Sequence, residues 1–275
     1  MSTRSEFTVI GGGTMGRGIA VAALIKTAAA VTVVETDAER AEALIGDIAD
    51  DVRSREGGDV SSRLRVVSSV EEAPESDLIV EAIPEIPDLK KRVLAAAEQR
   101  LNASGILASN TSSLSVTSLA EALTQPERFL GMHFFQPVPD TVLTELILHE
   151  GVADETVDAA QRWTQQLGRT PISATDTAGF ATTRLGLAIG LEAMRMVEEG
   201  VATPEDIDLG MNLGYQHAVG PLHMTDMVGL DVRLAIAEHM EQELGPRFAP
   251  PQILRDMVKA GKLGRKSGEG FFIWE

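Results

Sequence analysis

A histidine and a glutamate twelve residues apart stand out in the segment GMHFFQPVPDTVLTELI, which begins at residue 131. His133 lies in an apolar run, and Pro137 and Pro139 cannot continue a paired strand, so we expect the chain to turn there. The run VLTELIL then returns and brings Glu145 within reach of His133. An imidazole with an unperturbed pKa of about 6.5 can exchange a proton with an alcohol, and a buried carboxylate would fix its tautomer. The alternative is a buried strand that merely contains a hydrogen-bonded histidine.

A glycine-rich turn near the start of the chain favours the chemical interpretation. The segment FTVI is a short apolar run typical of a buried parallel strand, and GGGTMG follows it. In the pattern G-x-G-x-x-G the first glycine allows a tight turn, the second lets the backbone approach a pyrophosphate, and the third lets helix and strand pack closely. The helix that follows offers free N–H groups to phosphates. The cofactor contacts expected here are Gly11, Gly13, Thr14, Met15 and Gly16.

An acidic residue ends the next predicted strand and indicates which dinucleotide binds. Val31–Val34 is β-branched, and Glu35 follows it nineteen residues after Gly16. A carboxylate at this position can accept both hydrogen bonds from an adenosine ribose diol. It would repel a 2′-phosphate, and Thr36 offers no positive charge to offset this repulsion. The sequence therefore predicts NAD rather than NADP, with a helix N-cap as the alternative role for Glu35.

Strands and helices continue to alternate after this point. We expect strands at Leu64–Val67 and Leu78–Ala82, a helix at about 87–101, and a further strand in GILASNTSS. Such repeated units form a parallel sheet whose ligands lie beyond the carboxyl ends of the strands, where Glu85 and Ser112 fall. The sequence thus predicts an α/β domain over residues 1–175, with a Rossmann-type, doubly wound and mostly parallel sheet.

From residue 176 the pattern is helical, and it predicts a second, smaller all-helical domain over residues 176–275. We expect a long first helix that is buried on several sides, because apolar residues cover two of its stripes. One stripe contains Phe180, Leu187, Leu191 and Met194, and the other contains Leu185, Ile189 and Met196. Gly200 should end this helix, and Thr203 with Pro204 should begin the next. We expect the methionines at 224 and 227 to fill core, and the spacing of His217, His223 and His239 matches no metal site.

Composition limits the partners. The 275 residues carry a formal net charge of -17, which argues against nucleic acid and anionic membranes, because both bind basic surfaces. The absence of cysteine excludes disulfides and thiolate metal sites and fits a reducing compartment. The apolar run from Ile19 to Ile25 is too short to span a membrane. We therefore expect a soluble, cytoplasmic protein that contains no metal site.

The chain resembles the short-form L-3-hydroxyacyl-CoA dehydrogenases, a family that includes the 3-hydroxybutyryl-CoA dehydrogenases. The resemblance rests on motifs that occur in the family's order over nearly the whole chain. They are GGGTMGRGIA, DLIVEAIPE followed by DLKK, SNTSSLSVT, GMHFF, DTAGF and GRKSGEGFF. The combination is specific, although each motif alone is weak.

The resemblance implies roles for individual residues. His133 would be the general acid/base, Glu145 its orienting partner, and Ser112 a hydrogen-bond donor to the 3-oxygen of the substrate. Glu85 and Lys90 would contact the cofactor. The family also suggests a homodimer formed through the C-terminal domain.

Two positions depart from the family's pattern. Gln136 stands where the family typically has asparagine, which keeps the amide on a longer arm. Thr183 stands where the family often has an asparagine near the substrate. We expect both residues to contact the substrate, and the changes bear on which acyl group is preferred.

The resemblance implies NAD-dependent, reversible oxidation of an L-3-hydroxyacyl-CoA to the 3-ketoacyl-CoA. Three alternatives stay open at this point. The same chemistry could act on a thioester of an acyl carrier protein, or on a hydroxy acid without CoA. The chain could also be a non-catalytic NAD-binding subunit.

Overall fold

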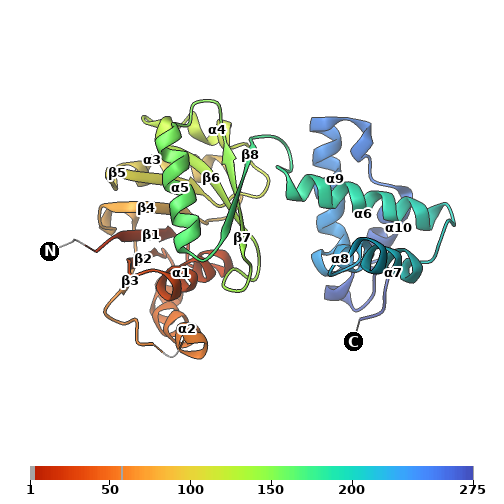
Figure 1. Cartoon of the computed structure of the whole chain (residues 1–275), viewed down its shortest axis with the longest axis horizontal. Coiled ribbons are helices and arrows are strands. Elements are labelled where there is room, and N and C mark those ends of the chain that lie inside the picture. Colours follow the sequence, from red (N-terminus) through yellow and green to blue (C-terminus); the bar gives the residue numbers. More distant parts are fainter. Residues whose placement is uncertain (1–3, 57, 275) are drawn as a thin grey trace. The chain divides into compact units, whose positions relative to one another are not determined.

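The chain divides into two units, residues 1–177 (unit 1) and residues 178–275 (unit 2), and the computed structural model describes residues 4–56 and 58–274 (Figure 1). The described residues of unit 1 form one eight-stranded sheet. Its strands are β1 (Glu6–Ile10), β2 (Ala30–Val34), β3 (Leu64–Val67), β4 (Ser76–Glu81), β5 (Leu101–Ser109), β6 (Phe129–Phe134), β7 (Leu143–Leu148) and β8 (Thr170–Thr175).

The order of the strands is β3-β2-β1-β4-β5-β6-β7-β8, and the direction of the chain reverses once across the sheet. All neighbouring strands from β3 to β6 are parallel, β6 and β7 are antiparallel, and β7 and β8 are again parallel. This arrangement confirms the predicted Rossmann-type, mostly parallel sheet. The carboxyl ends of β1, β4, β5 and β6 therefore meet at one edge, where ligands of such sheets bind.

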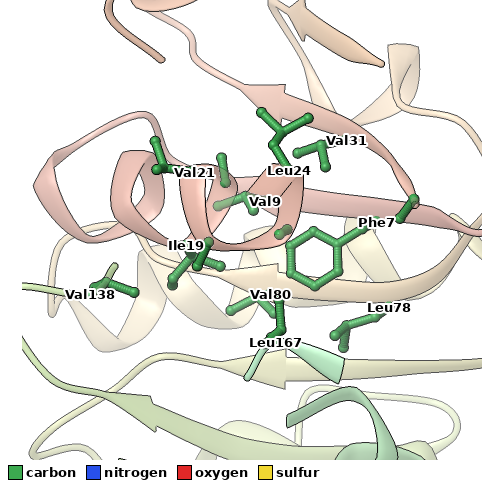
Figure 2. Packing of buried hydrophobic residues seen from close by; sticks show 14 of the residues in the cluster. Phe7, Val9, Ile19, Val21, Leu24, Val31, Leu78, Val80, Val138 and Leu167 are labelled. Atoms are coloured by element: carbon green, nitrogen blue, oxygen red, sulfur yellow. The ribbon is translucent and has the colours of Figure 1, made fainter. Parts of the chain in front are cut away.

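Helices cover both faces of the sheet. Those of unit 1 are α1 (Thr14–Lys26), α2 (Ala38–Glu56), α3 (Pro87–Glu98), α4 (Val116–Ala120) and α5 (Asp154–Gln166). A buried apolar cluster joins α1, α2 and α5 to one face, and Figure 2 shows side chains of α1 among those of β1, β2 and β4. Leu78 and Val80 of β4 belong to this cluster. Because side chains alternate along a strand, Ile79 and Glu81 point to the opposite face, toward α3.

The predicted boundary between α3 and the strand after it was wrong by a few residues. The helix ends at Glu98 rather than near residue 101, and the N–H of Arg100 closes a turn onto the carbonyl of Ala97. Leu101 is already the first residue of β5, where it pairs with Ser76. The tertiary pairing takes the end of an otherwise helical sequence into the sheet.

The regular elements of unit 2 are helices, as predicted, apart from two isolated β-bridges between residues 264 and 273. Within the described residues, no helix of either unit is long and apolar enough to cross a membrane. Its helices are α6 (Thr182–Glu198), α7 (Pro204–Tyr215), α8 (Pro221–Val228), α9 (Leu230–Leu244) and α10 (Gln252–Lys259). Thr203 caps α7 by accepting the N–H of Asp206, with Pro204 at the first helical position. Gly200 follows α6 with φ +70°, a conformation that suits glycine. Both predicted helix signals are thus confirmed.

The expected burial of α6 on several sides holds only in part. Leu187, Leu191 and Met194 are buried with residues of the neighbouring helices, but the side chain of Leu185 is 64% exposed. Phe180 lies before the helix, with φ +48°, and is not part of the stripe. In the second stripe Met196 packs against the same core, whereas Leu185 stays exposed, and the apolar pattern could not show this difference.

The two methionines that we expected in the core lie at the surface. Met224 is 39% exposed and Met227 is 45% exposed. They are on α8, whose buried residues include Leu222 and Asp226. The side of α8 that carries the methionines is therefore left uncovered within unit 2.

A buried aspartate ties the end of the described chain to α8. Asp226 is completely buried, and its carboxylate accepts the N–H groups of Phe271 at 2.9 Å and Phe272 at 3.0 Å. It also accepts the indole N–H of Trp274 at 2.8 Å. Three donors directed at one carboxylate compensate for its removal from water.

Replacing this carboxylate should free the last residues and destabilise unit 2. In Asp226→Ala we expect a loss of about 3 kcal/mol or more, because three buried donors lose their acceptor. Asp226→Asn keeps one acceptor oxygen and should lose less. Urea unfolding followed by Trp274 fluorescence in a Trp163→Phe background measures both values, and unfolding of Asp226→Ala at the parent's urea concentration would contradict this account.

Candidate active site

His133 and Glu145 are direct partners across the antiparallel pair β6–β7. The imidazole Nδ1 lies 2.8 Å from the Oε2 of Glu145. Glu145 is completely buried, and His133 is 7% exposed. The structure therefore brings together the two side chains that the sequence singled out, with the carboxylate oriented on one ring nitrogen.

Five of the predicted site residues line one cavity of unit 1. It has a volume of about 380 Å³ and lies beyond the carboxyl ends of the central strands. Met15, Glu85, Ser112, His133 and Gln136 all line it, together with Asn110 and Phe135. The ring of Phe135 lies 4.5 Å from the imidazole, centroid to centroid, and forms an apolar wall beside it. Met15 of the glycine-rich motif and His133 thus line the same cavity.

Glu85 is held in this cavity by several donors. Its Oε1 accepts the N–H of Ser112 at 2.8 Å and the hydroxyl of Thr111 at 3.0 Å. Its Oε2 lies 3.4 Å from the ammonium of Lys90. The hydroxyl of Ser112 makes only a long contact of 3.4 Å with Glu85, so it can turn to a ligand.

The expected contact of Lys90 with the cofactor stays a prediction, and the structure shows Lys90 as a buried residue behind Glu85. Its side chain is completely buried. Its ammonium lies 2.6 Å from Oε1 of Glu81, which is also completely buried. The other oxygen of Glu81 accepts the hydroxyl of Ser109 at 2.6 Å. Lys90 thus links this buried group to Glu85.

Sequence reasoning missed Glu81 and Asn110. A single glutamate inside the apolar run LIVEAI was the available signal for a buried charge that needs a partner. Asn110 follows β5, and its Oδ1 accepts the N–H of Phe134 at 2.9 Å. That bond holds the end of β6, and with it His133, against the end of β5.

The glycine turn has the geometry of a phosphate cradle. Gly11 has φ +104°, and a Cβ on Gly16 would lie 1.8 Å from the carbonyl oxygen of Gly11, so neither position accepts a side chain. A Cβ on Gly13 would meet nothing nearer than 3.8 Å, which leaves space for a ligand. Thr14 begins α1, and this helix has neither a side-chain cap nor an acidic residue in its first turn. Its first N–H groups suit a pyrophosphate, so these residues fit a dinucleotide.

Glu35 lies at the end of β2 beside this turn. Its Oε1 accepts the N–H of Asp37 at 3.0 Å, and a Cβ on Gly12 would lie 2.9 Å from its Oε2. Thr36 offers no positive charge here, but a residue further along the chain does. Arg40, in the first turn of α2, places Nη2 3.5 Å from Oε2 of Glu35.

A buried arginine supports the loop between β6 and β7. Arg169 donates to the hydroxyl of Thr141 at 3.1 Å and to the carbonyls of Leu143, at 3.0 Å, and Val138. Its guanidinium carbon lies 5.1 Å from the ring centroid of Phe134. Burial lowers the pKa of Arg169 to about 10, so it is charged at neutral pH. Arg169 thus holds in place the loop that carries Gln136.

Thr183 lies in α6 and is described with unit 2 alone. Its expected contact with substrate stays a prediction.

Within residues 4–56 and 58–274 no group of three or more histidine and acidic residues could hold a metal ion. His223 instead contacts Asp208, with Nδ1 3.0 Å from Oδ2, and its ring stacks on Phe272 at 3.7 Å.

Two family models match the chain. One is described as 3-hydroxyacyl-CoA dehydrogenase, NAD binding domain, and matches residues 6–177. The other is described as 3-hydroxyacyl-CoA dehydrogenase, C-terminal domain, and matches residues 179–274. The chain belongs to the 3-hydroxyacyl-CoA dehydrogenase family. This confirms the resemblance seen in the sequence and NAD as the cofactor, and it makes the chain an oxidoreductase.

Individual relatives agree with this assignment. The chain is 44% identical over 214 residues to the "Probable 3-hydroxybutyryl-CoA dehydrogenase" of Deinococcus radiodurans, which covers 78% of this chain and 77% of that one. It is 36% identical to the 3-hydroxybutyryl-CoA dehydrogenase of Mycobacterium tuberculosis over 97% of each chain. The crystal structure of (S)-3-hydroxybutyryl-CoA dehydrogenase from Ralstonia eutropha matches with a TM-score of 0.91 and 35% identity, over 99% of this chain and 100% of that one.

Removing only one member of the buried pair of Glu81 and Lys90 should lower the unfolding free energy strongly. We expect Lys90→Met to lose about 3–5 kcal/mol of unfolding free energy, because it leaves the Glu81 carboxylate buried without a counter-charge. The double variant Glu81→Gln/Lys90→Met should recover most of this loss.

Urea unfolding followed by Trp163 fluorescence, in a Trp274→Phe background, tests the pair. Lys91→Met is the matched control, since its ammonium is partly exposed and lies 3.5 Å from the exposed Glu121. That control should change stability by less than about 1 kcal/mol. A Lys90→Met protein as stable as its parent would show that the buried pair has no such role.

Proposed function

We propose that this chain catalyses the NAD-dependent, reversible oxidation of an L-3-hydroxyacyl-CoA, such as 3-hydroxybutyryl-CoA, to the 3-ketoacyl-CoA. The observation that carries the proposal is the 2.8 Å contact of Glu145 with His133, which lines a cavity together with Met15 of the glycine-rich motif. The names of the relatives support a CoA thioester as the substrate.

In this proposal His133 is the general acid/base. It accepts the proton of the 3-hydroxyl group during oxidation and returns a proton to the 3-keto oxygen during reduction. Glu145 keeps the ring in one tautomer and stabilises the imidazolium that forms, because a charge-assisted hydrogen bond in a buried site is strong. NAD, when bound, supplies the acceptor for the hydride of C3.

The remaining residues bind and orient. The hydroxyl of Ser112 donates to the 3-oxygen and stabilises its alkoxide character as the C–H bond breaks. The glycine turn, Thr14 and Met15 hold the pyrophosphate, Glu35 holds the adenosine ribose, and Glu85 holds the nicotinamide end. Phe135 excludes water from the imidazole.

In this proposal the acyl group contacts Gln136 of unit 1, and a contact with Thr183 of unit 2 stays a separate expectation. Both residues differ from the asparagines of the family pattern, so we expect the acyl preference of this protein to differ from that of relatives that keep them. A carrier-protein thioester and a hydroxy acid without CoA are not favoured by the names of the relatives. A non-catalytic subunit would have no chemical need to keep Ser112, His133 and Glu145 together.

The acid/base role is tested by mixing the purified protein with NADH and acetoacetyl-CoA and following the absorbance of the reduced cofactor. His133→Ala should lower kcat by about 10²–10⁴-fold, because a positioned acid is lost. Its affinity for NADH, measured by cofactor fluorescence, should be unchanged. His239→Ala, an exposed position on α9, is the control and should keep full activity.

Two outcomes would overturn this assignment. One is a His133→Ala variant as active as the parent. The other is a parent protein that binds NADH yet reduces no 3-ketoacyl-CoA, while it turns over a carrier-bound or free acid analogue. The second outcome would keep the chemistry and change the substrate class.

We further propose that the chain forms a homodimer through unit 2. Large apolar side chains are exposed on α6, α7, α8 and α9 of this unit, and such surfaces mark interaction sites. They are Leu185, Leu209, Leu213, Tyr215, Met224, Met227, Val228 and Val232. A cytoplasmic location and a role in fatty acid metabolism complete the proposal, and the absence of cysteine fits the first.

A charge in this surface should break the dimer. Leu213 is 76% exposed, so Leu213→Asp should not disturb the core of unit 2. Sedimentation equilibrium should give about twice the chain mass for the parent and the chain mass for this variant. Ile45→Asp, 47% exposed on α2 of unit 1, is the matched control and should stay dimeric. A monomeric parent, or a dimeric Leu213→Asp variant, would contradict the proposed interface.

A further inference from the structure

Arg40 lies where the ribose end of the cofactor site meets the glycine turn. Its Nη2 is 3.5 Å from Oε2 of Glu35 and 3.8 Å from the position that a Cβ on Gly13 would take. Its backbone N–H is held by Oδ1 of Asp37 at 3.0 Å, which fixes the start of α2 beside the end of β2. The guanidinium therefore stands next to the carboxylate that selects the ribose.

The bonding of Arg40 differs from that of other arginines on α1 and α2. Arg17 donates to Asp51 at 2.8 Å, and Arg53 donates to Asp50 at 2.7 Å. The side chain of Arg40 is 59% exposed, and its one ion pair in the described part of the chain is the long contact with Glu35. Most of its donors face solvent and can turn to a ligand.

A charge of this kind changes the discrimination that Glu35 imposes. The carboxylate that accepts the ribose 2′-hydroxyl lies next to the atom that bears the extra phosphate in NADPH, and it repels that phosphate. A guanidinium 3.5 Å from the same carboxylate lies within reach of the phosphate and attracts it. Arg40 thus offsets part of the negative charge that Glu35 and its neighbour Asp37 place there.

We propose that Arg40 is a specificity-determining residue that lets this protein use NADPH, a 2′-phosphorylated nicotinamide dinucleotide, as a second cofactor beside NADH. Arg40 binds the 2′-phosphate, and Glu35 keeps NADH the better cofactor. The proposal rests on the proposed function only in taking Glu35 as the ribose ligand. It concerns binding at the adenosine end and leaves the acid/base chemistry untouched.

The test compares kcat/KM for NADPH with kcat/KM for NADH in four proteins: the parent, Arg40→Ala, Glu35→Ala and the double variant. Arg40→Ala should lower the NADPH:NADH ratio about tenfold, through KM rather than kcat, because it removes one charge-assisted contact. Glu35→Ala should raise the ratio, and the double variant should lose most of that gain. Arg40→Lys, which keeps the charge, should fall between the parent and Arg40→Ala.

Arg53→Ala is the matched control, because Arg53 lies on the same helix about 20 Å along its axis. It should leave the ratio at the parent's value. Dissociation constants for NADPH and NADH, measured by the fluorescence of the reduced nicotinamide, repeat the comparison without any thioester. The Arg40 proposal therefore stays testable even if the protein reduces no 3-ketoacyl-CoA.

An NADPH:NADH ratio that is the same in the parent and in Arg40→Ala, by turnover and by binding, would overturn the proposal. So would a double variant that keeps the full gain of Glu35→Ala. Loss of activity with both cofactors on 3-ketoacyl-CoA, with the binding ratio still dependent on Arg40, would instead count against the proposed function alone.

Discussion

The antiparallel pairing of β6 with β7 is the constraint on which the site depends. Every other pair in the sheet is parallel, and this one reversal sets Glu145 directly opposite His133. A slip of one residue would turn the carboxylate to the other face of the sheet, because side chains alternate along a strand. The loop between the strands cannot drift freely, since Arg169 holds its backbone and Thr141 donates to the carbonyl of Phe135 at 2.9 Å. Register and loop together determine the geometry of the acid/base pair.

Two charged side chains are buried beside the cavity, and their removal from water costs free energy. Glu81 and Lys90 are both completely buried, and removing two charges from water is repaid only when their hydrogen bonds are satisfied. Here the oxygens of Glu81 accept Lys90, Ser109 and the N–H of Ile83 at 2.7 Å. The same ammonium reaches Glu85, which in turn holds the N–H of Ser112. We therefore infer that the main effect of the buried pair is to position Glu85 and Ser112 at the edge of the cavity.

Local chemistry made some of these features predictable from the sequence. Glycines with a fixed spacing, an acidic residue after a β-branched run, and two prolines that stop a strand each act over a few residues, so the turn, Glu35 and the return to Glu145 were foreseen. Features decided by distant neighbours were not foreseen. A lysine in a helix rich in charged residues gives no sign that it will be buried and paired with a glutamate of another element, as Lys90 is with Glu81. The exposure of Leu185 and Met224 depends on which helices cover each stripe, and Arg40 meets Glu35 only because of how α2 begins.

Glu85 and Glu35, the two carboxylates of the proposed cofactor site, each pair with a cation in a different environment. The partner of Glu85 is completely buried, so it is desolvated, weakly screened by salt and bound into the fold. The partner of Glu35 is more than half exposed, so it is screened, mobile in its rotamers and weakly tied to stability. A buried cation can fix geometry, but its replacement by another residue lowers the stability of the fold. An exposed cation can change with little cost, so selectivity for the cofactor can vary at Arg40 while the reacting centre stays constant.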